Sequence, residues 1–275
     1  MGYVEGINNG VIDSPYDSRD YTLDMLVSTA SSDILPPSYR TPTTVPVLSQ
    51  GSTSTCVACA LASCRYIQEE LQEGSASKFS VIYIYGNRLL TDTQNEGMIP
   101  RQALKTIVNF GDCHWDDFSG YCSYATAKSA YEADKERYDD LAYPYKINSY
   151  YSLSGVDEIK TAVYELGCAV ISINTRTSFR CPGSDGYVEY DDTETIGGRH
   201  MVTVVGWTED DHWVVLNSWG ANYGDGGYCY LSFDYPINEA WSMVDDYRYA
   251  DLKFVQYTRK AAGVFLGIKK KRYLC

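Results

Sequence analysis

The strongest constraint on the fold is a change in hydrophobic pattern a little past the middle of the chain. Up to about residue 166, apolar residues recur at helical spacing. They predict helices from Ser54-Thr55 to Gly74 and over about 80–90, 100–110 and 156–166. Short β-branched and aromatic runs follow and predict strands at 169–173, 200–207, 212–217 and 227–231. Helices first and strands second predict an α+β protein of two lobes.

The charge of the chain argues against two classes of partner. The 275 residues are enough for a large core, and they include 23 Lys and Arg against 36 Asp and Glu, a net charge of −13. Such an acidic surface repels phosphate backbones and anionic lipid, so we expect neither nucleic acid nor a membrane as partner. No apolar run approaches the length of a membrane span.

The nine cysteines do not form a recognisable metal site. They stand at 56, 59, 64, 113, 122, 168, 181, 229 and 275. Only Cys56 and Cys59 have CxxC spacing, and three histidines leave a zinc site short of ligands, so no metal or cofactor is expected. An odd number leaves at least one thiol free or paired between chains. Cys113 with Cys122 is a conceivable disulfide that spacing alone does not fix.

The N-terminal segment, residues 1–34, is predicted to be an extension of the domain. Met1-Gly-Tyr-Val-Glu-Gly-Ile7 lacks the basic and apolar regions of a secretory signal, which predicts the cytoplasm or another reducing compartment. Residues 1–34 are polar and rich in turn signals, such as Asn8-Asn9-Gly10 and Asp13-Ser14-Pro15. They predict an extended arm rather than a domain.

Cys56 is the candidate nucleophile. It stands in the first turn of the expected long helix, where partial positive charge stabilises a thiolate. A thiolate attacks carbonyl groups. The alternative is that Cys56 is a small buried apolar residue, which is our interpretation of Cys59 and Cys64 on the same helix. Neighbouring motifs decide between these two interpretations of Cys56.

Three polar residues complete a constellation with Cys56. Gln50 lies six residues earlier, and its amide can donate to an oxyanion together with the Cys56 backbone amide. Gln50-Gly51 alone would be no more than a turn. His200 begins a predicted strand and lies 144 residues after Cys56. Asn217 lies 161 residues after Cys56. Peptidases of the papain type place His and Asn about 130–150 residues after the cysteine, so the scale agrees.

The most specific string is Asn217-Ser-Trp-Gly220, continued by Tyr223-Gly224 and Gly226-Gly-Tyr228. With it the chain resembles the papain family of cysteine peptidases. Gln50 to Ala58 is similar to the nucleophile segment of that family. His200 and the strand after it are similar to the strand that carries the histidine in that family. Weaker similarities follow in the same order at Glu96–Pro100, Tyr143–Tyr145 and Ile159–Val170, so the resemblance spans about residues 35–245.

The resemblance implies a papain-like fold, a helical lobe and a β-barrel-like lobe with the cleft between them. We expect one peptidase domain over 35–275, mainly helical over 35–145 and mainly strand over 146–275, after the extension 1–34. By resemblance, Cys56 is the nucleophile and His200 the general base. Asn217 orients the imidazole and Gln50 supplies the oxyanion donor.

The same resemblance implies the substrate-binding residues. Trp219 should cover the Asn217–His200 pair from water. Gly97 and Met98 should line the cleft wall that pairs with the substrate backbone. Gly198 and Met201 should border the pocket for the side chain that precedes the scissile residue.

Several positions depart from the family pattern. Val57 replaces the aromatic residue after the nucleophile, and Thr53 replaces a cysteine, so the corresponding disulfide cannot form. The long helical propeptide is missing. These features are similar to those of bacterial and virus-encoded members. Arg199 puts a positive charge before the histidine, where the family often has a carboxylate or an amide.

The sequence thus predicts a cysteine endopeptidase that acts on polypeptides, with residues 1–34 as a candidate inhibitory segment. Two alternatives use the same cleft. The Cys–His pair can pass the acyl group to an amine or cut isopeptide bonds, and a non-catalytic relative would only bind. A bacterial-type transglutaminase would carry Asp in place of Asn217.

Overall fold

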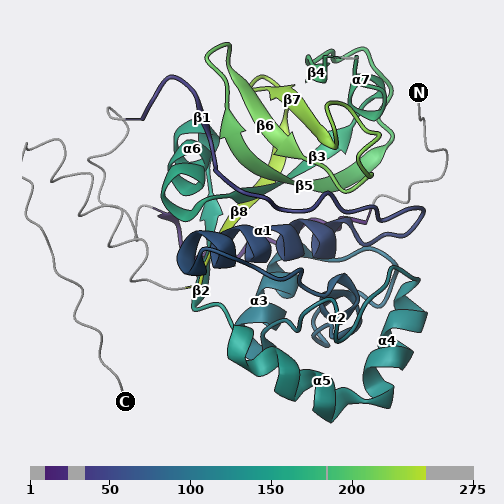
Figure 1. Cartoon of the computed structure of the whole chain (residues 1–275). Coiled ribbons are helices and arrows are strands. Elements are labelled where there is room, and N and C mark those ends of the chain that lie inside the picture. Colours follow the sequence, from purple (N-terminus) through teal and green to yellow (C-terminus); the bar gives the residue numbers. More distant parts are fainter. Residues whose placement is uncertain (1–9, 24–34, 184, 246–275) are drawn as a thin grey trace, which may run out of the picture.

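The structure, a computed structural model, describes residues 10–23, 35–183 and 185–245. Figure 1 shows a layer of strands on one side of a long central helix and a group of shorter helices on the other. The central helix is α1 (Cys56–Glu73). It ends where the sequence predicts, because Gly74 adopts φ 79° and donates its N–H to the Glu70 carbonyl at 2.9 Å. The predicted α+β class is confirmed.

The helical layer is built from α2, α3, α4 and α5. Their bounds are α2 (Val81–Gly86), α3 (Pro100–Phe110), α4 (Tyr124–Ala133) and α5 (Lys135–Ala142), followed by the 3₁₀ turn η3 (Tyr143–Tyr145). The prediction over 100–110 is correct, whereas α2 is shorter than the predicted 80–90. Helices α4 and α5 were not predicted because both are largely exposed, with few buried side chains to give an apolar period.

The second layer is an eight-stranded sheet. Its strands are β1 (Tyr39–Arg40), β2 (Ser149–Leu153), β3 (Ala169–Thr175), β4 (Tyr187–Val188), β5 (Gly198–Trp207), β6 (His212–Leu216), β7 (Tyr228–Ser232) and β8 (Ile237–Val244). The order is β2-β8-β3-β5-β6-β7-β4, with β1 also paired to β5. All pairs are antiparallel except β4 with β7. Helices α6 (Gly155–Leu166) and α7 (Thr177–Arg180) accompany this layer.

Strand β5 joins the two layers. Its side chains alternate, so Met201 and Val205 belong to the hydrophobic cluster around α1, while Val202 and Val204 belong to a second cluster on the opposite face of the sheet. Thr203 donates its hydroxyl to the Ala60 carbonyl of α1 at 3.2 Å. The start of β5, with His200, therefore lies beside the start of α1, with Cys56.

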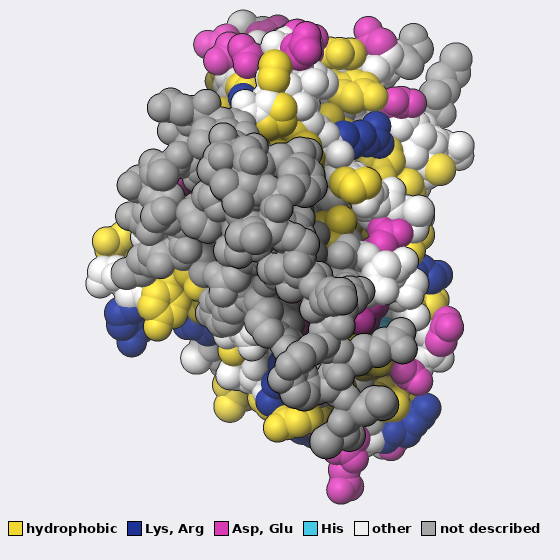
Figure 2. Space-filling model, turned by 60° about the vertical axis from the view of Figure 1, so that its left-hand side comes forward, with side chains coloured by type: hydrophobic (Ala, Val, Ile, Leu, Met, Phe, Trp, Pro, Cys, Tyr) yellow, Lys and Arg dark blue, Asp and Glu magenta, His cyan; other side chains and the backbone are white. Residues whose placement is uncertain are grey.

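The described thiols are all free. Eight cysteines, including Cys113 and Cys122, form no disulfide in the part of the chain that the structure describes. Within the same residues no helix is long and apolar enough to cross a bilayer, and no three His, Cys, Asp or Glu side chains gather as a metal site. Figure 2 shows acidic side chains gathered at the upper end of the face in view, in keeping with the net charge of −13.

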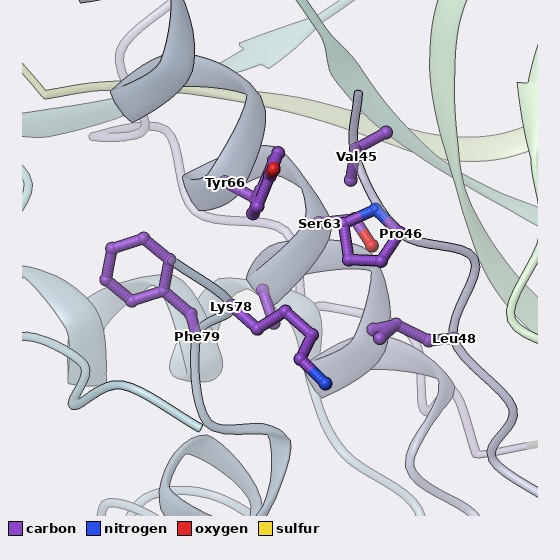
Figure 3. A pocket seen from close by; sticks show the side chains of 8 residues that line it. Val45, Pro46, Leu48, Ser63, Tyr66, Lys78 and Phe79 are labelled. Carbon is purple, nitrogen blue, oxygen red and sulfur yellow. The ribbon is translucent and has the colours of Figure 1, made fainter. Parts of the chain in front are cut away.

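A small hollow lies away from the start of α1. Figure 3 shows Val45, Pro46 and Leu48 of the extended segment facing Ser63 and Tyr66 of α1, with Lys78 and Phe79 alongside. Its volume of ≈ 10 Å³ holds about one water molecule at most. It is too small to be a substrate site.

Candidate active site

Cys56 is the first residue of α1, as predicted, and its side chain is fully buried. Thr55 precedes the helix at the predicted cap position, but its side chain makes no capping bond. The Thr55 hydroxyl instead contacts Thr53 Oγ1 at 2.8 Å and Cys59 Sγ at 3.7 Å. The backbone N–H groups at the start of α1 therefore remain directed toward the sulfur and the space around it.

His200 and Asn217 are joined by a short hydrogen bond. His200 Nε2 lies 2.8 Å from Asn217 Oδ1, and both side chains are buried. Asn217 Oδ1 also accepts the Ser218 N–H at 2.8 Å, which holds the amide in one orientation. The other ring nitrogen of His200, Nδ1, is buried and has no hydrogen-bond partner among the described residues. The amide thus fixes the ring and leaves Nδ1 available for proton transfer.

Aromatic rings cover the His200–Asn217 pair. The Trp219 ring centroid lies 4.7 Å from that of His200, and the Phe179 ring centroid 6.0 Å from it. Trp219 and Phe179 also meet edge to face at 5.4 Å. This arrangement agrees with the predicted place of Trp219. Phe179 of α7 was not predicted, because one phenylalanine in a short polar segment carries no periodic signal.

Gln50 is held at the junction by hydrogen bonds to Ser218 and Thr53. Its backbone N–H donates to the Ser218 carbonyl at 2.9 Å, and its side-chain Oε1 accepts the Ser218 hydroxyl at 2.6 Å. Its side-chain Nε2 donates one hydrogen to the Thr53 carbonyl at 2.7 Å. Since an amide nitrogen carries two hydrogens, one remains for a further acceptor. Ser218 was not singled out from the sequence, although it stands inside the Asn217-Ser-Trp-Gly string.

The N-terminal arm lies over Cys56. Gly10 is packed so closely that a Cβ there would come within 3.1 Å of Cys56 Sγ. Met98 donates its N–H to the Gly10 carbonyl at 2.7 Å and accepts the Ile12 N–H at 2.9 Å, so Val11 pairs with Met98 as in a parallel ladder. Val11 is buried in the same cluster as Met98, Met201 and Cys56.

The predicted wall and pocket residues lie next to this arm. Gly97 leaves room for Ile12, because a Cβ on Gly97 would come within 3.0 Å of that side chain. Met201 is fully buried, and its backbone amide lies against the Cys56 sulfur. Gly198 begins β5 opposite Thr175, with a φ of 143° that favours glycine. The structure therefore brings the nine predicted site residues to one region between the two layers.

Burial favours the neutral forms of Cys56 and His200. Desolvation raises the pKa of the Cys56 thiol, although the backbone amides of Met201 and Gly10 beside the sulfur act in the opposite direction. Desolvation also lowers the pKa of His200 to about 4, against the opposing effect of the Asn217 hydrogen bond. With the arm in place, burial therefore favours the uncharged forms of the thiol and the imidazole.

Comparison with known sequences agrees with this geometry. The profile described as "Papain family cysteine protease" matches residues 39–243. A cathepsin B-like cysteine proteinase of Caenorhabditis elegans is 31% identical over 108 residues, which are 38% of this chain and 28% of that protein. Macrodontain-1 of Ananas macrodontes is 43% identical over 36 residues, 13% of this chain and 17% of that protein. The chain thus matches less than a third of the length of either relative.

Solved structures share the fold. Xylellain, a cysteine protease from Xylella fastidiosa, has a TM-score of 0.74 and 21% identity over 90% of this chain and 99% of that one. The bromelain protease from Ananas comosus, in complex with the E64 inhibitor, has a TM-score of 0.59 and 16% identity over 77% of this chain and 100% of that one. The chain belongs to the papain family of cysteine proteases.

Proposed function

We propose that this chain is a cysteine endopeptidase that hydrolyses peptide bonds with Cys56 as nucleophile. The observation that carries the proposal is the 2.8 Å bond between His200 Nε2 and Asn217 Oδ1. That bond leaves Nδ1 buried without a partner, on the strand whose next residue, Met201, contacts the sulfur. An imidazole held in this way takes a proton from the thiol, and the Asn217 amide orients the ring without neutralising its charge.

The reaction has two halves. His200 Nδ1 accepts the thiol proton, and the Cys56 thiolate attacks the substrate carbonyl to give a tetrahedral oxyanion. The Cys56 backbone N–H and the second hydrogen of Gln50 Nε2 are placed to stabilise that oxyanion. The imidazolium then gives its proton to the departing amine, leaving a thioester. Water, deprotonated by His200, hydrolyses the thioester and returns the free thiol.

We further propose that the arm inhibits the enzyme in this chain. The backbone groups of Met98 that a substrate would use are bonded to Gly10 and Ile12. Further along, Arg101 binds the arm through the Asp20 carboxylate at 2.6 Å and through the Pro15 carbonyl. Departure of the arm admits water, which lowers the desolvation cost of a thiolate–imidazolium pair. Removal of the arm is therefore the activating step.

The free thiols support a reducing compartment for the protein. Eight described cysteines are unpaired, and Cys181 among them is exposed. Exposed free thiols persist where small-molecule thiols keep them reduced. Intact mass measured without reductant, before and after mild oxidation, tests this placement; a native mass that already includes disulfides contradicts it.

Selective alkylation tests the proposed nucleophile. The protein without residues 1–34, in which the arm no longer covers Cys56, is treated with limiting iodoacetamide near pH 6, and the labelled cysteine is mapped by mass spectrometry. We expect Cys56 to label preferentially, and the labelling to be lost in His200→Ala. Cys59→Ala is the matched control, since it removes a neighbouring buried thiol and should leave the labelling of Cys56 unchanged.

Product analysis then separates hydrolysis from acyl transfer. A quenched peptide is incubated with the protein, with and without an added primary amine. Hydrolysis gives a free carboxylate in both cases. Predominant capture of the acyl group by the amine would instead support a transferase, and no turnover by a protein whose Cys56 labels readily would contradict the peptidase proposal.

A further inference from the structure

Arg199 is the cationic side chain next to His200 at the start of β5. It lies opposite Asn174 of β3, and the next residue on the same face of β5, Met201, lies opposite Ser172. Ser172 in turn lies opposite Glu239 of β8. Since the Met201 side chain belongs to the hydrophobic cluster that includes Cys56, this face of the sheet is turned toward α1. Arg199 therefore lies on the face that is turned toward α1.

In this structure, the carboxylate that pairs with Arg199 comes from the arm. Arg199 forms an ion pair with Asp13, at side-chain exposures of 32% and 54%. It makes no ion pair with Glu239 in the described part of the chain, and Glu239 instead accepts the Trp241 indole N–H at 2.8 Å and the Ser14 N–H at 3.4 Å. When the arm leaves, Arg199 loses the carboxylate that it has in this structure.

The spacing along the arm relates Arg199 to the nucleophile. Gly10 lies at the Cys56 sulfur, and Asp13 follows three residues later, after the pairing of Val11 with Met98. Suppose that an extended substrate pairs with Met98 as the arm does. Its side chain two or three residues from the residue at the Cys56 sulfur would then reach Arg199. The chain as a whole has a net charge of −13 and repels acidic groups, whereas the Arg199 guanidinium attracts an acidic side chain at this one position.

We propose that Arg199 determines specificity by binding an Asp or Glu side chain two or three residues from the scissile bond of the substrate. The inference rests on the proposed peptidase function and deepens it. Arg199 presents a planar fork of N–H donors, which suits a carboxylate better than an amide or an ammonium group. The arm's Asp13 and the acidic side chain of a substrate would then compete for the same cation.

The test uses the full chain and a set of matched peptides. The peptides carry Glu, Gln or Lys at the second or the third residue from the cleaved bond, on either side of it, and kcat/KM is measured for each. Inhibition by the arm lowers the rates on all peptides by one common factor, so the ratio of rates between two peptides reports specificity alone.

We expect the wild-type protein to prefer Glu over Gln by about fivefold at one of these positions, the value of a partly exposed ion pair. Arg199→Gln should abolish the preference, and Arg199→Glu should reverse it toward Lys. Arg137→Gln is the matched control, because it removes one positive charge from the exposed surface of α5 and should leave the ratios unchanged. Equal Glu-to-Gln ratios in wild type and Arg199→Gln would overturn the proposal.

The two proposals fail in different ways. Cleavage of all peptides without an acidic preference would refute the role of Arg199 and leave the peptidase proposal standing. Absence of any cleavage by the full chain, and also by the protein without residues 1–34, would count against the peptidase proposal. In that case binding of the same peptides to Cys56→Ala, followed by fluorescence anisotropy, still decides whether Arg199 selects a carboxylate; equal affinities for Glu and Lys peptides would refute it.

Discussion

Substitution of Gly10 by alanine is a direct test of the arm's position, because it adds a single carbon at the point where the arm meets Cys56. The new Cβ would be 2.7 Å from the Ser54 carbonyl carbon, still closer to the carbonyl oxygen, and 3.1 Å from Cys56 Sγ. The Ser54 atoms are backbone atoms at the start of α1 and cannot rotate away. We therefore expect the arm, rather than the helix, to move.

The size of the effect follows from the contacts that this movement disrupts. The bond from Met98 N to the Gly10 carbonyl, 2.7 Å long, is lost or lengthened, at a cost of about 0.5–1.5 kcal/mol. Val11 is the next residue and is 6% exposed, so partial loss of its burial adds about 1 kcal/mol. A combined weakening of about 1.5–2.5 kcal/mol corresponds to a roughly 10- to 70-fold larger fraction of open protein.

The assay is the second-order rate of Cys56 alkylation by iodoacetamide, with peptide turnover measured in parallel. Both rates should rise together in Gly10→Ala, because both require the arm to leave the sulfur. Gly183→Ala is the matched control: the nearest atom to its new Cβ is the flexible end of Asp185, so neither rate should change. Identical alkylation rates in wild type, Gly10→Ala and Gly183→Ala would refute the conclusion that the arm covers Cys56.

Three further predictions concern the site. Asn217→Ala leaves His200 Nε2 buried without a partner at a cost of about 1–3 kcal/mol, so we expect kcat/KM to fall roughly 5- to 150-fold, measured on a peptide substrate. Gln50→Ala removes the proposed oxyanion donor and should lower kcat by about 10²–10³-fold with little change in KM. A rise in KM with unchanged kcat would contradict that role. Burial lowers the pKa of His200 from 6.5 to about 4, so the unfolded state binds the proton first as the pH falls. Urea denaturation should therefore show the free energy of unfolding decreasing between pH 6.5 and pH 4, by about 3 kcal/mol from this residue, and His200→Gln should lack that contribution.

Most of the fold could be predicted because the hydrophobic period changes along the chain. The start of α3 follows from a proline at the first helical position. The end of α1 follows from Gly74, the residue directly after its last helical residue. Strands β5 and β6 follow from continuous apolar runs buried on both faces. Strand β8 was not predicted, because its polar first residues interrupt the apolar pattern.

The candidate site could be predicted as a set of residues but not as an arrangement. Gln50, Cys56, His200 and Asn217 are recognisable by type, spacing and the neighbouring Trp219. The sequence gives no reason to choose Ser218 as the residue that holds Gln50, since that contact spans 168 positions. Long-range contacts of this kind depend on how two lobes pack, and no local pattern encodes them.

The sequence by itself determined the class of fold, the helix that carries Cys56 and the identity of the polar side chains, since all of these depend on local periodicity and residue chemistry. Only the tertiary structure decided where the arm lies and which forms of Cys56 and His200 are favoured. The arm is polar and has no period, so its place depends on bonds to Met98, Arg101 and Arg199, which lie far along the chain. The pKa shifts arise from burial between two layers, and burial is a property of the packed molecule.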